Sequence, residues 1–236
     1  MHRTEIFADV AARVKARSGK EHPFDVLDPR RTALVVIDMQ NYFVHPESPA
    51  ALPVARAIVP SINLLAAELR HRGGLVAWVR TGARDTLDAW SVYNNHLMTP
   101  ERRDRRLAAM GADGFHFWRE NDIHDEDLLV TKTRFSAFIQ GSSDIDSLLR
   151  QRGIDSLLIV GTVAGICCES SARDAMMLNY KVVMVSDALA SYSDMEHNAA
   201  LSGFYAMFGD VQTVQECVAS LDRGTSAKPP HALAAS

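Results

Sequence analysis

Short apolar runs alternate along this chain with longer stretches in which apolar residues recur at helical spacing. Each run is of the uninterrupted kind that fills a parallel strand buried on both faces. The runs predict six strands, the last at an edge: Ala33–Asp38, Leu75–Val79, Leu128–Lys132, Ser156–Val160, Lys181–Ser186 and Val211–Val214. Strands separated by helices pair in parallel, because the connecting helix returns the chain to the same end of the sheet.

The stretches between the runs have apolar positions three and four residues apart, which predicts amphipathic helices. The pair Gly73-Gly74 ends one of these helices before the next strand. The predicted helices are Thr4–Arg17, Pro53–Arg72, Ser142–Gly153, Glu169–Asn179 and Asp194–Phe208. The alternation indicates a single-domain α/β fold, with a doubly wound (Rossmann-like), mainly parallel sheet of about six strands and helices on both faces.

The connectors suggest how the chain is organised. Residues 1–30 hold the first helix and a proline-containing connector, residues 31–222 form the main domain, and residues 223–236 are expected to be a disordered tail. The stretch 81–127 is expected to be a lid or a subunit contact, because so long an insertion in a compact domain is usually functional. Its charge run 101–106, ERRDRR, is expected to be a solvated helix face.

Composition narrows the class of protein. With 236 residues, 47% of them hydrophobic, and a net charge of −4, the chain is long enough for one substantial core. It has no basic cluster for nucleic acid or an anionic membrane, and no apolar stretch near the roughly 20 residues of a membrane span. The cysteines, at 167, 168 and 217, do not form a disulfide framework. Residues 1–17 do not resemble a secretory signal, so a cytoplasmic location is expected.

Three reactive side chains stand at the carboxyl ends of predicted strands. Asp38 ends one apolar run, Lys132 ends another, and Cys167 lies where a strand gives way to a helix. Each of these residues, taken alone, also has a purely structural explanation, as a turn residue, a solvated charge or a packed cysteine. Ligands of open parallel sheets bind at this end of the strands, so the three side chains can converge. A helix start favours an anion, so we expect the Cys167 thiol to ionise more readily than a free thiol.

Three motifs around these residues resemble those of the isochorismatase-like cysteine hydrolases, over about residues 30–218. They are D-M-Q with a following aromatic at Asp38–Phe43, K-x-R-[YF]-S-[AG]-F at Lys132–Phe138, and G-x-x-x-x-x-C-x-E-[ST]-[ST]-x-R-D-A at Gly161–Ala175. In look the chain is closest to the ureidoacrylate and N-carbamoyl amidohydrolases of that superfamily. The resemblance supports the fold predicted above.

The resemblance also implies the roles of particular residues. Asp38 would be the general base, Lys132 its electrostatic partner and Cys167 the nucleophile. The peptide Thr162–Val163 would be cis, and the backbone N–H groups of Val163 and Cys167 would form an oxyanion hole. One departure from the family pattern concerns Ala164 and Gly165, which stand where many relatives have Thr and Asn. The neighbouring Cys168 is expected to pack in the core.

The resemblance leaves several reactions open. A cysteine nucleophile favours hydrolysis of a C–N bond in a small amide or ureide over the vinyl ether hydrolysis of true isochorismatases. Nicotinamidase-like chemistry would add a metal site with D-x-H after the second strand, but this chain has VRTGARD there. His96 and His116 lack metal spacing, so no metal and no cofactor are expected. The alternative outside enzymes is an inactive relative that binds a small molecule; the first strand turn, DMQNYF, lacks a glycine cradle for phosphate.

A substrate pocket is expected around the insertion and the segment after Lys132. Its predicted residues are Phe43, Trp90, Asn94, Asn95, Arg134 and Phe135, with Asn94 or Asn95 binding a carbamoyl group beside an aromatic ring. Arg80 and Arg134 are candidates for pairing a substrate carboxylate, and Phe138 is a further candidate for the pocket. The expected partners are therefore a small amide or ureide substrate and further copies of the chain in a homo-oligomer, with no nucleic acid and no membrane.

Overall fold

One parallel sheet of six strands organises the molecule. The computed structural model describes residues 1–82, 90–111 and 113–226. The strands are β1 (Thr32–Ile37), β2 (Leu75–Thr81), β3 (Leu128–Lys132), β4 (Ser156–Thr162), β5 (Lys181–Ala190) and β6 (Asp210–Gln212). Their order is β3-β2-β1-β4-β5-β6, and every neighbouring pair is parallel. This is the doubly wound sheet that the apolar runs predict, and it is confirmed.

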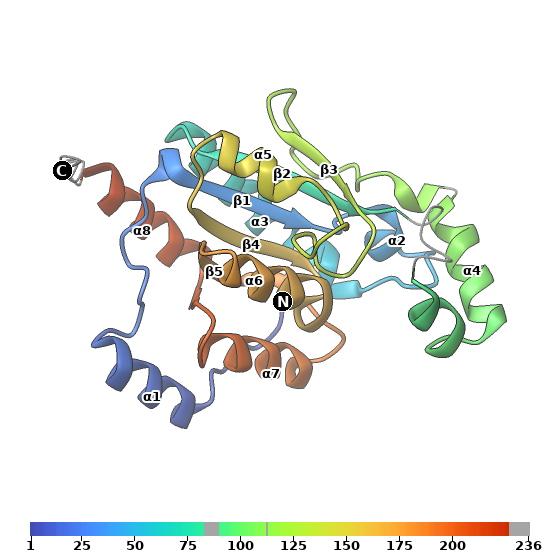
Figure 1. The fold of residues 1–236 in the computed structure, drawn as a ribbon, viewed down its shortest axis with the longest axis horizontal. Helices are drawn as coiled ribbons and strands as arrows, with labels where there is room; N and C mark the ends of the chain where they lie inside the picture. The colour runs from blue at the N-terminus through green and yellow to red at the C-terminus, as the bar shows by residue number, and fades with distance from the viewer. Residues whose placement is uncertain (83–89, 112, 227–236) are drawn as a thin grey trace.

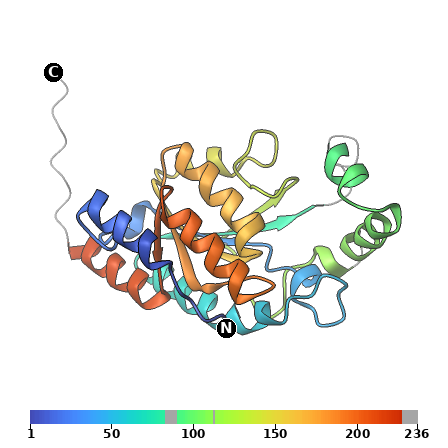
Figure 2. The ribbon, with the colours of Figure 1, turned by 90° about the horizontal axis from the view of Figure 1, so that it is seen from below.

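Helices cover both faces of the sheet (Figures 1 and 2). One core contains residues of α5 (Ile145–Gln151), α6 (Glu169–Met177) and α7 (Asp194–Tyr205), packed on one side of β1, β4 and β5. The other core contains residues of α3 (Pro53–His71) and α8 (Val214–Ser226), packed on the opposite side. The central strands β1, β4 and β5 are buried on both faces, which is why their sequences are apolar without alternation, whereas the edge strand β3 exposes Leu129 and Thr131.

The start and end of the chain depart from the expected elements. The first helix, α1 (Ala8–Ser18), begins later than Thr4, because the residues before it run along α7 instead. There the backbone N–H groups of Glu5 and Phe7 donate to Asn198 and Ser202, which satisfies them outside a helix. At the other end, Val214 begins α8, which continues to Ser226. The boundary expected at residue 223 therefore falls inside a helix, and residues 227–236 lie outside the described part.

The insertion expected at residues 81–127 carries helices of its own. They include a π-helical turn, η3 (Val92–His96), and α4 (Pro100–Gly111). Figure 1 shows α4 beyond the arrowheads of the strands, at the carboxyl end of the sheet. A short helix, α2 (Asn41–Val44), lies after β1 at the same end. Among the described ranges, no helix is both long and apolar enough to cross a membrane.

Strand register brings the predicted site residues to one level. Ile37, which precedes Asp38, is paired with Val79 of β2 and with Gly161 of β4. Thr81 is paired with Lys132 on the next strand. β1 lies between β2 and β4, where the strand order reverses, and this is where open α/β sheets bind ligands.

Candidate active site

Asp38 and Lys132 form a buried ion pair at the carboxyl end of the sheet. Nζ of Lys132 lies 2.9 Å from Oδ2 of Asp38, and both side chains are fully buried. Thr81 links the two, because its hydroxyl donates to Oδ1 of Asp38 at 2.9 Å and accepts from Nζ of Lys132 at 2.6 Å. The ammonium group also donates to the carbonyl of Arg134 at 3.1 Å. The carboxylate is therefore held by a cation and a hydroxyl in a fixed position. The sequence analysis missed Thr81, although its place at the end of β2 was a usable signal.

The backbone at Asp38 has an uncommon conformation, and the neighbouring strand lies very close to it. Asp38 has a φ of 54°, a left-handed conformation that Asp tolerates better than most residues, and its N–H donates to the carbonyl of Val79 at 2.8 Å. Gly161 of the adjacent strand has a φ of 109°, and a Cβ there would lie 2.0 Å from the carbonyl oxygen of Ile37. Only glycine allows β4 to approach β1 so closely just before the turn that carries Cys167.

Cys167 lies on a π-helical turn, η5 (Ala164–Cys168), between β4 and α6. The Thr162–Val163 peptide before it is cis, as the resemblance implies. Ser171 anchors this turn by donating to the carbonyl of Cys167 at 2.7 Å while accepting from the N–H of Ala137 at 3.0 Å. Ser171 thereby joins the segment after Lys132 to the turn that carries Cys167. The second serine of the E-S-S run was quoted as part of the motif, but its role follows only from these contacts.

The electrostatics of Cys167 correct one expectation. Burial raises the pKa of this thiol to about 12; Lys132 lowers it, but Asp38 works in the other direction. The expected lowered pKa is therefore wrong, because the thiol is almost fully buried beside a carboxylate. For Lys132, burial opposes the charge, but Asp38 and Cys167 outweigh it, so its pKa is raised. The resting site thus pairs an ammonium and a carboxylate with a neutral thiol that interacts with both.

Cys168 and Cys217 are buried away from this chemistry. The Sγ of Cys168 lies 3.9 Å from the carbonyl of Val160, inside the core. Burial raises the pKa of both thiols well above its usual value. The packing role expected for Cys168 is confirmed by this position.

A cavity of about 500 Å³ opens above Cys167. Three aromatic rings form one side of it, and we call them the aromatic wall: Trp90, Tyr93 and Phe135. Trp90 and Tyr93 stack at 4.4 Å between centroids, and Phe135 meets both edge to face at 4.8 and 5.0 Å. Such mutually packed rings give a rigid apolar surface for a flat substrate group.

Four of the six predicted substrate-binding residues line this cavity: Phe43, Trp90, Arg134 and Phe135. The two asparagines do not belong to its described lining. Asn94 is fully buried, with its amide donating to the carbonyl of Trp90 and accepting from Arg106, and Asn95 is exposed and accepts from Arg103. Their amides serve helix contacts of the insertion, so the carbamoyl role given to Asn94 or Asn95 has no geometric support.

Two further pocket candidates also lie elsewhere. Arg80 places its guanidinium 3.8 Å from the centre of the Phe115 ring, and Phe138 packs in the core against Tyr180. Neither belongs to the described lining of the cavity. Side chains alternate in direction along a strand and its extension, and spacing alone did not reveal which way these two point.

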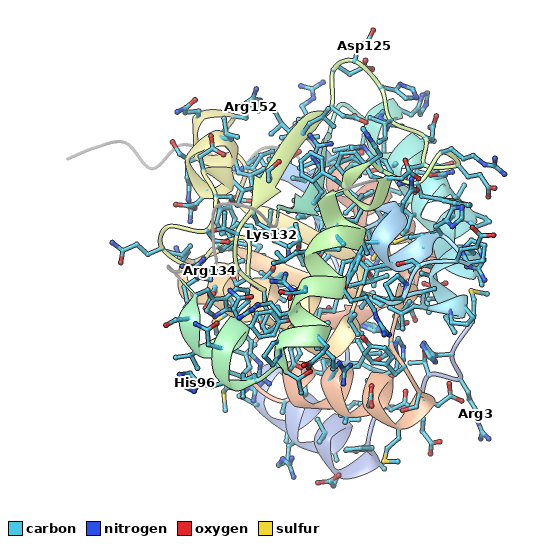
Figure 3. The ribbon with its side chains drawn as sticks, turned by 90° about the vertical axis from the view of Figure 1, so that its right-hand side faces the viewer. Arg3, His96, Asp125, Lys132, Arg134 and Arg152 are labelled. Carbon is cyan, nitrogen blue, oxygen red and sulfur yellow. The ribbon has the colours of Figure 1, made fainter. Side chains whose placement is uncertain are left out.

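One residue of the charge run on α4 departs from the solvated face that the sequence predicts, because Arg106 is buried whereas Arg102 and Arg105 are exposed. Arg102, Arg105 and Arg106 all line the cavity together with Cys167, and we call these three residues the arginine wall. Figure 3 looks at this end of the molecule, with α4 crossing in front of the strand ends and the labelled Lys132 and Arg134. Arg102, Arg106 and Met110 are four residues apart, so they share one helix face. The buried Met110 at the end of that series was the signal that this face turns inward.

No group of three or more His, Cys, Asp or Glu residues suited to a metal ion occurs among the residues that the structure describes. His96 and His116, which the sequence analysis set aside as ligands, are both exposed. The site combines a thiol, a carboxylate and an ammonium group beside a cavity lined by aromatic and cationic side chains.

Similarity to known proteins agrees with this geometry. The chain matches the Isochorismatase domain family over residues 32–216. It is 32% identical over 190 residues to an uncharacterized isochorismatase family protein, YwoC, of Bacillus subtilis, covering 80% of this chain and 94% of that protein. It is 28% identical over 213 residues to the ureidoacrylate amidohydrolase RutB of Klebsiella variicola, covering 84% and 89%.

Among solved structures, a cysteine hydrolase from Pseudomonas syringae pv. phaseolicola superposes with a TM-score of 0.75 at 25% identity. That match covers 84% of this chain and 95% of the other. The fold and site define a hydrolase of the isochorismatase-like cysteine hydrolase superfamily, which includes amidohydrolases. The chain belongs to the isochorismatase family.

Proposed function

We propose that this protein is a cysteine-dependent amidohydrolase that cleaves the C–N bond of a small amide or ureido (N-carbamoyl) substrate. The observation that carries the proposal is the convergence of Asp38, Lys132 and Cys167 beside one cavity. A buried carboxylate next to a thiol can take its proton, and a thiol so activated is a strong nucleophile. The similarity to a ureidoacrylate amidohydrolase and to a cysteine hydrolase supports the same reaction class.

The proposed first half-reaction makes a thioester. Asp38 takes the proton from Sγ of Cys167 as the sulfur forms a bond to the substrate carbonyl carbon. The C–N bond then breaks, and Asp38 returns the proton to the departing nitrogen, which leaves as ammonia or an amine. Because the pKa of the thiol is about 12 in the resting site, this proton transfer has to accompany substrate binding and attack rather than precede them.

The second half-reaction hydrolyses the thioester. Asp38 takes a proton from water while the water oxygen bonds to the carbonyl carbon, and the C–S bond breaks with the sulfur regaining that proton. The product is a carboxylic or carbamic acid. Lys132 keeps Asp38 ionised and oriented through both halves. The backbone N–H groups of Val163 and Cys167, residues that line the cavity, are proposed to hold the oxyanion.

The experiment that tests the proposal is an ammonia-release assay over a panel of primary amides and ureides. The substrate that turns over is then given to Cys167→Ala and, as the matched control, Cys168→Ala. We expect Cys167→Ala to lose about a thousandfold or more in turnover, because no other group can form the thioester. Cys168→Ala should keep near-normal turnover.

The same assay separates the alternatives. Vinyl ether hydrolysis releases no ammonia, so a vinyl ether is added to the panel and its carbonyl product is measured; this reaction requires an acid but no nucleophile and would survive in Cys167→Ala. An inactive binding relative would show no turnover on any member of the panel while still binding some of them. The homo-oligomer and the cytoplasmic location expected from the sequence remain predictions, and sedimentation of the purified protein tests the first of them.

A further inference from the structure

Arg106 is a buried cation with no carboxylate partner among the described residues. Its side chain is on α4 and faces the cavity, and the residue is only 8% exposed. Nη2 donates to the amide oxygen of Asn94 at 2.6 Å, and the guanidinium lies 5.3 Å from the centre of the Tyr93 ring. Nε is buried and has no hydrogen-bond partner. Among the described residues, none forms an ion pair with it.

A folded protein tolerates a buried charge when the charge is paired. The other buried cation among the described residues, Lys132, follows that rule with Asp38, and the partly buried Arg70 has Asp127 and Asp122. An amide oxygen and an aromatic ring compensate a full charge only in part. Among the described residues, Arg106 therefore has no anion that balances its charge.

The rest of the cavity carries the same sign of charge. Arg102 and Arg105 of α4 and Arg134 line it as well, and its described lining contains no carboxylate. The three guanidinium groups of α4 give this side of a cavity of about 500 Å³ a positive potential, which attracts anions. Asp38 and Lys132 add no net charge to this region, because the two groups neutralise each other.

We infer that the substrate is an anion, a small ureido or amido acid whose carboxylate pairs with Arg106 while its carbamoyl or amide carbonyl meets Cys167. The inference rests on the proposed function and narrows its substrate class. A guanidinium binds a carboxylate through two parallel N–H donors, and the unpartnered Nε is one such donor. The insertion that carries α4 thus selects the substrate, and the sheet performs the chemistry.

Paired substrates test this directly. The series is N-carbamoylglycine, N-carbamoyl-β-alanine and N-carbamoyl-4-aminobutyrate, each compared with the alkylurea of the same length, which lacks the carboxylate. We expect kcat/KM for the best ureido acid to exceed that of its alkylurea by about thirtyfold or more, the effect of one buried charge pair. Arg106→Gln should remove that preference, mainly by raising KM for the ureido acid. Arg106→Lys should restore part of it.

The matched control is Arg103→Gln. Arg103 is on the same helix but contacts Asn95 and Asp104 and does not line the cavity, so its replacement should preserve the preference for ureido acids. Equal turnover of ureido acids and alkylureas in wild type, or an unchanged preference in Arg106→Gln, would overturn the inference. Loss of both activities in Arg106→Gln together with a lowered unfolding temperature would also overturn it, because it would assign Arg106 a purely structural role.

Binding without turnover separates this inference from the proposed function. Malonate, succinate, glutarate and inorganic phosphate are added to the protein, and the midpoint of thermal unfolding is followed, since a ligand of the folded state raises it. At least one dicarboxylate should raise the midpoint of wild type and of Cys167→Ala but not of Arg106→Gln. If these shifts are observed while no panel compound is hydrolysed, the carboxylate site at Arg106 is supported and the proposed amidohydrolase reaction is contradicted. Stabilisation by phosphate alone, or equal stabilisation of Arg106→Gln, contradicts the site.

Discussion

Cys167 and the arginine wall line the same cavity, and buried charge is balanced differently in the Asp38–Lys132 pair beside Cys167 and in Arg106 of the wall. Asp38 and Lys132 lie 2.9 Å apart, fully buried, with Thr81 bonded to both. Arg106 is also buried, but its described partners are one amide and one aromatic ring. The charges of Asp38 and Lys132 balance each other without a ligand, whereas the charge of Arg106 has no counter-ion among the described residues.

The difference separates two tasks that an enzyme site performs. Groups that move protons have to hold their geometry and charge before substrate arrives, so their partners belong to the protein. Groups that recognise a substrate gain selectivity by leaving a charge for the substrate to neutralise, because a neutral competitor then leaves that charge unpaired. The triad is on strand ends and a turn at the sheet, and the arginine wall is on an inserted helix.

The largest expected effect is the loss of turnover when either residue of the ion pair is replaced. Asp38→Asn removes the proton acceptor, and Lys132→Ala removes the charge that keeps the carboxylate ionised; each should reduce turnover by about a hundredfold or more. Since the two residues share one step, the double variant should be scarcely worse than either single one. Steady-state rates of the four proteins give the answer, with circular dichroism as a control for folding. Losses that multiply would show that Asp38 and Lys132 act independently.

Stability provides the next contrast between the two regions. Lys132→Met leaves the Asp38 carboxylate buried without its cation, and this should lower the free energy of unfolding by about 3–5 kcal/mol. Arg106→Gln removes a charge that has no ion-pair partner among the described residues, and it should not lower that free energy. Urea denaturation of the two variants beside wild type measures both. A similar large loss in Arg106→Gln would place Arg106 among the structural residues.

The pH dependence of alkylation sharpens the description of the triad. With a pKa of about 12, the thiolate fraction of Cys167 rises about tenfold per pH unit throughout the range below that value. Its rate of modification by iodoacetamide should therefore keep rising from pH 7 to pH 10. Mass spectrometry of the Cys167 peptide follows the rate, and Arg106→Gln should show the same profile. A plateau at or below about pH 8.5, the value of a free thiol, would contradict the raised pKa.

The smallest expected effect is that of metal removal. Prolonged incubation with a chelator, followed by dialysis, should leave turnover within about twofold, because the proposed reaction uses only the thiol, the carboxylate and the ammonium group. Zinc, manganese and iron are added back to identical samples as the control. Loss of activity that one of these ions restores would favour nicotinamidase-like chemistry.

Much of this architecture could be read from local sequence. The runs ending at Ile37 and Thr162 are apolar because their strands are buried on both faces, and that local fact placed these strands within a few residues. Helix α8 was missed because its first residue, Val214, also continued an apolar run, and its last turn has the small polar residues of a tail. In such ambiguous segments, tertiary contacts choose between strand, helix and coil.

The sequence by itself determined that Asp38, Lys132 and Cys167 converge, since each lies at or after the end of a strand and the carboxyl ends of parallel strands share one edge. The tertiary structure alone decided the state of those residues and the character of the pocket. The thiol of Cys167 has a raised pKa because distant segments bury it, and Arg106 faces inward because of where the insertion packs α4. Burial is a property of what surrounds a side chain, and residues far apart in sequence supply those surroundings.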